Sequence, residues 1–240
     1  IGEPYGVATD AEGNLYIGSA VLVSSSYWAH RILKVDRNGM ITEETRNLPS
    51  SQTGFARDAQ GNYYHTWRDY NCIYKIDRQN AITTYGMCSM NSGGGFSGDG
   101  GPATAARFNL PVGIDVDSSG NVYIADKYNH RIRKIDTNGT ITTFAGTGAA
   151  ASNGDGGRAT AAALYYPVGV AADGLGNVYI AEEYARRVRK VDPSGLVSTF
   201  AGSPGLTGST DGTGAAARFL GPLGLAVDAA RSHAGGALPY

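Results

Sequence analysis

The stretch from Pro111 to Phe144 decides the fold, because it holds four short strand patterns separated by tight turns. It reads Pro111-Val-Gly-Ile-Asp-Val-Asp117, Gly120-Asn-Val-Tyr-Ile-Ala-Asp126, His130-Arg-Ile-Arg-Lys-Ile-Asp136 and Thr140-Ile-Thr-Thr-Phe144. Runs of β-branched and aromatic residues this short predict strands rather than helices. We name the four strands a, b, c and d in chain order.

The turns between these strands carry residues that favour chain reversal. The a–b turn reads Asp-x-x-Gly-Asn in every copy, as from Asp117 to Asn121. Asp accepts hydrogen bonds from nearby N–H groups, and Gly adopts the positive φ that such hairpins need. The c–d turn has Asn80 where the other copies have Gly39, Gly139 and Gly195. Because Asn also tolerates the left-handed conformation, we predict the turn in every copy.

The pattern occurs four times, and its first strand begins a fifth time. The glycines of the successive first strands are Gly6, Gly54, Gly113, Gly169 and Gly224, a period of 48 to 59 residues. This period, built from four short strands, is typical of propeller blades. We predict an all-β fold, a β-propeller of four-stranded antiparallel blades, in one domain over 1–240. Its repeats span about 4–48, 52–88, 111–146 and 167–202, with an incomplete repeat at 222–228.

The last residues break the pattern. Residues 229–240 have no Gly-Asn turn and no second strand. Four blades and one inner strand fit a short ring, part of a larger ring, or a ring that another chain completes, and a truncated sequence is the favoured interpretation. An open final blade also predicts self-association through an unpaired edge.

Three motifs resemble the NHL-repeat family in its bacterial and extracellular form. They are Asn129-His-Arg-Ile-Arg-Lys134, Gly120-Asn-Val-Tyr-Ile-Ala-Asp126 and the linker Phe96-Ser-Gly-Asp-Gly-Gly-Pro-Ala-Thr-Ala-Ala-Arg-Phe108. The resemblance covers about residues 4–228 and implies a β-propeller, usually of six blades. It implies little about activity, because such propellers serve as adaptors, ligand binders and occasionally lyases.

Composition excludes several classes of partner. The net charge is −1 and the pI about 6.5, so no strong field draws the chain to nucleic acid. No run of 18 apolar residues predicts a membrane span. The chain starts at Ile1 without a signal-peptide pattern, as expected of a mature form or an excised piece.

The histidines give weak support for a metal site. His30 and His130 share one slot, which holds Asn71 and Arg186 in the other copies. A slot that accepts these types favours hydrogen bonding over ligation, since a closed site needs three or four convergent ligands. His65 stands where other copies have Ile, which favours a satisfied core histidine. We therefore predict no metal, no cofactor and no catalytic residues, and the sequence favours a non-enzymatic protein.

The Gly-rich linkers, such as Ser97-Gly-Asp-Gly-Gly101 and Asn153-Gly-Asp-Gly-Gly157, resemble phosphate or calcium loops only superficially. They lack the Lys-Ser/Thr of a P-loop and the alternating carboxylates of a calcium loop. An Ala-rich segment follows each linker and predicts a single helical turn. That turn is expected to be anchored by Phe108, Leu164 or Phe219.

The b–c loops are expected on the propeller face that also carries the linkers between blades. The first copy has a seven-residue insertion there, Ala20-Val-Leu-Val-Ser-Ser-Ser26, and all copies place aromatic or charged residues nearby. This composition is typical of a recognition surface, although tyrosines can also cover the ends of blade junctions. The predicted binding rim is Tyr27, Trp28, Trp67, Arg68, Tyr70, Asp126, Tyr128, Glu182 and Tyr184.

Cys72 and Cys88, the only cysteines, both lie in the second copy. If Ile76 faces Ile82 in the c–d hairpin, the two cysteines become diagonal neighbours. We predict a disulfide, and hence an extracellular or periplasmic location, with two free thiols as the alternative.

These observations favour a non-enzymatic NHL-type β-propeller, a secreted scaffold that binds a protein, peptide or glycan through the aromatic b–c face. The alternative is a metal-dependent lyase or hydrolase with its site in the axial channel. RNA binding is a weaker third hypothesis, because the arginines occupy slots that the repeat itself determines.

Overall fold

The protein forms four four-stranded antiparallel sheets in the computed structural model, which describes residues 3–24, 27–48, 52–88 and 93–227. The first blade contains β1 (Glu3–Thr9), β2 (Leu15–Ser24), β3 (Tyr27–Val35) and β4 (Ile41–Leu48). The second contains β5 (Gln52–Arg57), β6 (Tyr63–Trp67), β7 (Cys72–Ile76) and β8 (Ile82–Tyr85). The third contains β9 (Pro111–Val116), β10 (Val122–Asp126), β11 (Arg131–Ile135) and β12 (Ile141–Ala145). The fourth contains β13 (Pro167–Ala172), β14 (Val178–Glu182), β15 (Arg187–Val191) and β16 (Val197–Gly202).

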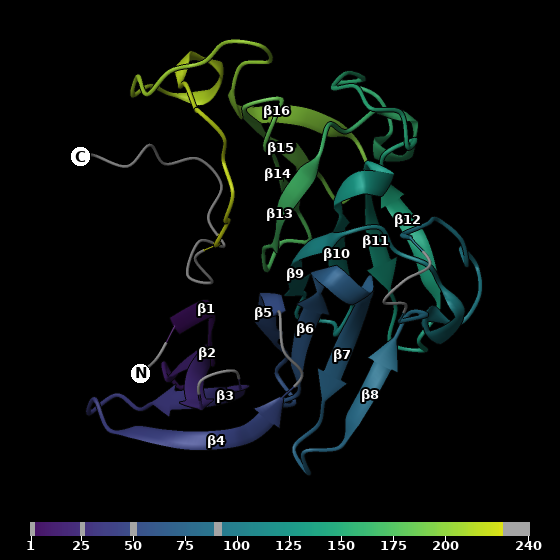
Figure 1. Ribbon diagram of the computed structural model, residues 1–240. Coiled ribbons are helices and arrows are strands. Elements are labelled where there is room, and N and C mark those ends of the chain that lie inside the picture. Colours follow the sequence, from purple (N-terminus) through teal and green to yellow (C-terminus); the bar gives the residue numbers. More distant parts are fainter. Residues whose placement is uncertain (1–2, 25–26, 49–51, 89–92, 228–240) are drawn as a thin grey trace.

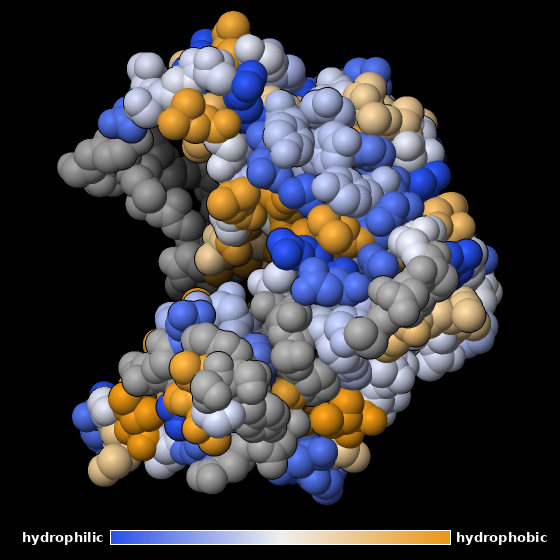
Figure 2. Space-filling model, viewed as in Figure 1, coloured by the Kyte–Doolittle hydropathy of each residue, from blue (hydrophilic) through white to orange (hydrophobic). Residues whose placement is uncertain are grey.

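The blades follow one another in an arc, with strand a of each blade innermost (Figure 1). β1 contacts β5, β5 contacts β9 and β9 contacts β13, so the first strands surround a common axis. The predicted β-propeller architecture of four complete blades is therefore confirmed. The space-filling view shows a mainly hydrophilic surface in which apolar residues form separate patches (Figure 2).

The structure of residues 222–227 differs from the prediction of a fifth first strand in one respect. This segment lines the axial channel with Leu225, Ala226 and Val227, as an inner strand would, but it forms no strand. A strand needs a hydrogen-bonded neighbour, and the described residues supply no strand b beside it. The segment expected to form the first strand of a fifth repeat thus lies where that strand would lie, but it is not paired with a neighbouring strand. Asp228, the last residue of that predicted repeat, and residues 229–240 lie outside the described residues.

The repeated glycine of strand a allows successive blades to approach closely. A Cβ atom on Gly113 would lie 2.5 Å from the carbonyl oxygen of Val168 in the next blade, and one on Gly169 would lie 2.5 Å from that of Leu223. Gly54 meets the carbonyl of Val112 in the same way. Only a residue without a side chain fits these backbone contacts, which explains why the repeat opens on glycine.

The turns have the predicted conformations. Gly13, Gly61, Gly120 and Gly176 all have positive φ in the a–b turns. Asn80 has φ of 63° at the position where Gly39, Gly139 and Gly195 have φ of 80° to 83°. The Asn exception is therefore explained by its tolerance of the left-handed region.

The Gly-rich linkers have a structural role, as predicted. Arg133 and Arg189 are fully buried on strand c of the third and fourth blades. Arg133 Nη2 donates to Asp99 Oδ1 at 2.7 Å, and Arg189 Nη2 donates to Asp155 Oδ1 at 2.5 Å. Each linker aspartate thus forms an ion pair with an arginine of the blade that follows it.

The Ala-rich segments after these aspartates form single 3-10 turns, η2 (Ala103–Ala105) and η4 (Ala159–Ala161), and a third turn is η5 (Gly214–Ala216). The predicted anchors Phe108 and Leu164 are 1% and 0% exposed, whereas Phe219 is half-buried. None of the described helices is long and apolar enough to cross a membrane.

Cys72 and Cys88 form a disulfide, with their Cα atoms 4.9 Å apart. Ile76 pairs with Ile82 in the hairpin of β7 and β8, which is the register that the prediction assumed. The disulfide connects β7 to the segment that leaves the second blade.

We expect Gly113→Ala to lower the free energy of unfolding by about 1–3 kcal/mol, because the new methyl group overpacks a backbone contact. Gly224→Ala is the matched control, since it occupies the same repeat position but meets no atom within 4 Å. Denaturant unfolding of both variants measures the difference, and equal effects would contradict the close-approach explanation.

Removal of the disulfide by Cys72→Ala with Cys88→Ala should destabilise the protein by about 3 kcal/mol, because the bond closes a loop of 16 residues. A reducing agent should destabilise the parent to a similar extent and leave the double variant unchanged. If the reducing agent leaves the unfolding midpoint of the parent unchanged, the disulfide does not contribute to stability.

Candidate functional site

The b–c turns and the interblade linkers meet on one face, as predicted. The turns of the second and third blades are the 3-10 helices η1 (Arg68–Tyr70) and η3 (Lys127–Asn129). Asn71 and His130 follow these helices in the left-handed conformation, with φ of 55° and 53°. Asn71 Oδ1 accepts from the N–H of Leu110 at 2.7 Å, and His130 Nδ1 accepts from that of Tyr166 at 3.3 Å. The slot shared by Asn and His therefore hydrogen-bonds the linker of the next blade.

Four tyrosines form a cluster on this face at the junction of the third and fourth blades. We call Tyr128, Tyr165, Tyr166 and Tyr184 the tyrosine cluster. The rings of Tyr128 and Tyr166 have centroids 5.6 Å apart, and those of Tyr166 and Tyr184 4.9 Å, both edge to face. Tyr128 and Tyr184 are 48% and 53% exposed, while Tyr165 and Tyr166 are half-buried. Tyr165 and Tyr166 thus pack against the protein, while Tyr128 and Tyr184 are accessible to solvent.

An ion pair crosses the same junction. Lys127 Nζ lies 2.7 Å from Glu183 Oε2, and the same ammonium is 5.8 Å from the centroid of the Tyr184 ring. His130 adds an edge-to-face contact with Tyr166 at 4.6 Å. These contacts hold the two exposed tyrosines between neighbouring blades, so the surface is ordered before any partner arrives.

Trp67, Tyr70 and Arg68 belong to the second blade. The rings of Trp67 and Tyr70 stack with centroids 3.6 Å apart, and Trp67 is half-buried against Tyr74. Arg68 is exposed and pairs with Asp69 at 3.3 Å. This part of the predicted rim is on the expected turn, but Trp67 mainly packs against its own blade.

Asp126 and Glu182 are corrections to the predicted rim, because both are fully buried. Asp126 Oδ1 accepts from the N–H of Asn109 at 2.7 Å, and Glu182 Oε1 accepts from that of Tyr165 at 2.6 Å. Burial raises the pKa of Asp126 to about 6 despite the hydrogen bonds from Asn109 and Asn129. Both carboxylates hold the end of a linker and present nothing to solvent.

The insertion of the first copy extends a hairpin rather than forming a loop. β2 and β3 continue to pair as far as Leu22 with Trp28 and Ser24 with Tyr27. Leu22 and Val23 are 51% and 61% exposed on this extension. The side chains of Tyr27 and Trp28 lie outside the described residues, so their place on the rim stays a prediction.

Tyr165 and Tyr166 were missed by the sequence prediction. They lie directly before the proline that begins strand a, where the other linkers have Asn109-Leu110 and Leu220-Gly221. Comparison of the linker ends between copies could have found them, because only this copy places two aromatic residues there.

His65 and His30 are buried between the first two blades, at 0% and 6% exposure. Tyr5 lies between them, with ring centroids 6.1 Å from His65 and 5.8 Å from His30. The core position predicted for His65 is confirmed, but neither of its ring nitrogens has a hydrogen-bond partner. Burial, with a smaller contribution from His30, lowers the pKa of His65 to about 3. No group of three or more His, Cys, Asp or Glu side chains among the described residues is arranged to hold a metal ion.

The axial channel has a cavity of about 330 Å³ lined by the inner strands. Asp115 is the one acidic side chain among its described lining residues, and burial raises the pKa of this carboxyl to about 6. Its Oδ2 accepts from the N–H of Ala172 at 2.8 Å, which links the third blade to the fourth. The carboxylate therefore contributes to blade docking.

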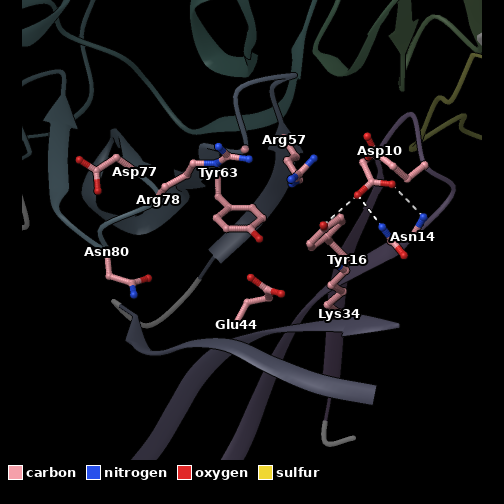
Figure 3. Close-up of a pocket in the computed structure, with 12 residues that line it drawn as sticks. Asp10, Asn14, Tyr16, Lys34, Glu44, Arg57, Tyr63, Asp77, Arg78 and Asn80 are labelled. Carbon is pink, nitrogen blue, oxygen red and sulfur yellow. Dashed lines mark hydrogen bonds between the residues drawn. The ribbon is translucent and has the colours of Figure 1, made fainter. Parts of the chain in front are cut away.

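A larger cavity, of about 530 Å³, opens between the first and second blades on the side of the a–b turns (Figure 3). Asp10, Tyr16, Lys34 and Glu44 line it from the first blade, and Arg57, Tyr63 and Arg78 from the second. We call it the interblade pocket.

Two contacts order the walls of the interblade pocket. Tyr16 donates its hydroxyl to Asp10 Oδ2 at 2.9 Å, and the Arg57 guanidinium lies 4.2 Å from the centroid of the Tyr16 ring. Partial desolvation of Asp10 opposes its ionisation, but hydrogen bonds from Asn14 and Tyr16 together hold the pKa of Asp10 below its ordinary range.

The fold and these sites define an NHL-type β-propeller, and comparison with known sequences places it in a family. The family described as the teneurin NHL domain matches residues 4–153 and 147–219, and the chain belongs to this family. Teneurin-1 of Gallus gallus is 50% identical over 50 residues, which are 21% of this chain and 2% of that protein. Teneurin-3 of Danio rerio is 37% identical over 102 residues, 37% of this chain and 4% of that protein. The chain thus matches a small part of these relatives.

Similar structures support the fold alone. A protein of unknown function from Bacteroides thetaiotaomicron has a TM-score of 0.67 at 19% identity, over 91% of this chain and 52% of that one. An auxiliary nutrient binding protein from Bacteroides ovatus has a TM-score of 0.63 at 17% identity, over 94% of this chain and 54% of that one. A gluconolactonase from Xanthomonas campestris has a TM-score of 0.57 at 17% identity, over 95% of this chain and 67% of that one. One architecture therefore serves binding proteins and enzymes alike.

The contribution of His65 to the stability of the protein should fall as the pH drops below about 6.5, the ordinary pKa of histidine in an unfolded chain. Asp115 and Asp126, whose pKa values burial raises to about 6, act in the opposite direction below that pH, so the effect of His65 is measured against a variant. Between that pH and about 3, the unfolded chain binds a proton at His65 that the folded chain does not. The loss is about 1.4 kcal/mol per pH unit from this residue. His30, whose pKa burial also lowers, acts in the same direction.

His65→Ile is the matched variant, since Ile17, Ile124 and Ile180 occupy the same repeat position. Urea unfolding at several pH values between 5 and 7 should show that the free energy of unfolding of the parent falls relative to that of the variant as the pH drops. Identical slopes would mean that His65 titrates normally in the folded protein.

Proposed function

We propose that this chain is a non-enzymatic binding module of an extracellular or periplasmic protein, and that it recognises a protein, peptide or glycan through the b–c face. The tyrosine cluster is the observation that carries the proposal. Exposed Tyr128 and Tyr184 stand over half-buried Tyr165 and Tyr166 and beside the Lys127–Glu183 ion pair. Tyrosines dominate many recognition surfaces, because a large ring with a polar end loses little conformational entropy on binding.

The disulfide supports the proposed location. Cys72–Cys88 closes within the second blade, and disulfides of this structural kind persist in oxidising compartments. The location thus rests on redox chemistry rather than on the names of similar proteins.

A metal-dependent lyase or hydrolase in the axial channel has less support. The channel presents Asp115 and Arg57 as charged groups among its described lining residues, and Asp115 already accepts an interblade hydrogen bond. Hydrolysis or elimination would require a second acid or base, or a metal, near the same position.

Tyr128→Ala with Tyr184→Ala should weaken partner capture at least tenfold and change the unfolding midpoint little, because both rings are about half exposed. The measurement is binding of the purified chain to a glycan array and to a displayed library of extracellular protein domains, followed by titration of the ligand found.

Leu175→Ala is the control. Leu175 is 49% exposed in an a–b turn, on the opposite face of the fourth blade. A ligand that binds the double variant and the parent equally would remove the tyrosine cluster from the site, and loss of folding in the double variant would show that both rings are core residues.

A further inference from the structure

The interblade pocket differs from the corresponding junctions of the other blades in a consistent way. Glu44 stands where the later blades have Tyr85 and Phe144, and Arg57 stands where they have Val116 and Ala172. At the other two junctions those aromatic and aliphatic side chains pack against the hydrophobic cores. Two apolar contacts of the repeat have thus been replaced by one carboxylate and one guanidinium.

The missing Gly-rich linker explains why this junction stays open. η2 docks on the c–d turn of the third blade, where Ala103 donates its N–H to Gly139, and η4 docks in the same way on Gly195. The short connection between the first and second blades contains no such segment. As a result, Ile82 is 46% exposed in the second blade, whereas its counterparts Ile141 and Val197 are 0% and 1% exposed.

Two guanidinium groups converge on one wall of the pocket. A Cβ atom on Gly61 would lie 2.8 Å from Arg78 Nε and 3.2 Å from Arg57 Nη2, so both side chains lie over this glycine. Neither forms an ion pair with a carboxylate among the described residues. Arg57 Nε is also buried without a hydrogen-bond partner. Two adjacent guanidinium groups without a carboxylate ion pair favour a bound carboxylate, which matches the planar guanidinium.

The opposite wall has the opposite charge. The first blade contributes three carboxylates and one lysine to the lining, and the second contributes two arginines and one carboxylate. Figure 3 shows the Glu44 carboxylate across from Arg57 and Arg78, with the Tyr63 ring between them. Glu44 has no ion-pair partner among the described residues, so its charge is available to a cationic group.

We propose that the interblade pocket binds a small zwitterion of the amino-acid class, a free α-amino acid or a short peptide. Its carboxylate lies against Arg57 and Arg78, and its ammonium lies against Glu44. A simple anion would leave Glu44 unpaired, and a simple cation would leave the two arginines unpaired, so a ligand with both charges satisfies the walls best. The volume of about 530 Å³ lies within the range of small-molecule sites. This site is separate from the tyrosine cluster, and either can fail without the other.

The test is a thermal-shift screen of the purified chain against the individual L-amino acids and unblocked dipeptides, followed by calorimetric titration of the tightest probe. Its N-acetylated and C-amidated forms should each bind at least tenfold more weakly. Glu44→Gln and Arg78→Gln should each weaken the unblocked probe at least tenfold. Glu44 and Arg78 are both exposed, so neither substitution removes a buried side chain.

Arg68→Gln is the matched control, because Arg68 is an exposed arginine of the same blade on the opposite face. Several results would overturn the proposal. They are the absence of binding at millimolar concentrations, equal binding of the blocked forms, glucuronate or phosphate binding as tightly as the unblocked probe, or an equal loss in Arg68→Gln.

Discussion

The ion pair between a partly exposed linker aspartate and a buried strand-c arginine is the contact on which the later blades depend. Asp99 reaches Arg133 and Asp155 reaches Arg189, and both arginines are fully buried. Each guanidinium also lies near a buried carboxylate, with Asp126 3.5 Å from Arg133 and Glu182 4.0 Å from Arg189, so each arginine connects its linker to strand b of its own blade. Loss of the linker aspartate would leave a buried guanidinium with fewer partners, which destabilises the fold. Once the linker is held by this contact, η2 and η4 cover the c–d turns and the linker ends reach the b–c face.

The first two blades lack this contact, and their junction differs accordingly. Leu33 and Tyr74 occupy the arginine position there, and no Gly-rich linker enters between them. The outer part of the junction is therefore open, and its apolar contacts have been replaced by Glu44 and Arg57. Both ring nitrogens of His65 and Nε of Arg57, which are buried without hydrogen-bond partners, lie at the same junction, where the repeat is least regular.

The fold could be predicted because every element repeats. A residue type that recurs at the same position of several copies indicates a structural requirement at that position. Asn80 in place of Gly, the alanine segment after each Gly-Asp-Gly, and the register that brings Cys72 near Cys88 all follow from local conformational rules. The candidate site was only partly predictable. Asp126 and Glu182 were predicted to lie on the exposed rim. The sequence does not reveal their burial, because their partners, the N–H groups of Asn109 and Tyr165, lie 17 residues away in the chain. The interblade pocket needs residues of two blades, which no single repeat reveals.

Both candidate surfaces arise where one blade meets the next, and that has a physical cause. Within a blade, strand pairing satisfies the hydrogen bonds of the backbone, so the backbone conformation can vary little. Between blades, contact depends on side chains, so a substitution there can create a cavity or an exposed cluster without breaking a sheet. The side chains differ between the two junctions that carry the candidate surfaces. Between the third and fourth blades, Tyr166 and the Lys127–Glu183 pair close the junction and leave two tyrosines facing solvent. Between the first and second, no Gly-rich linker covers the junction, and charged side chains line the cavity that remains.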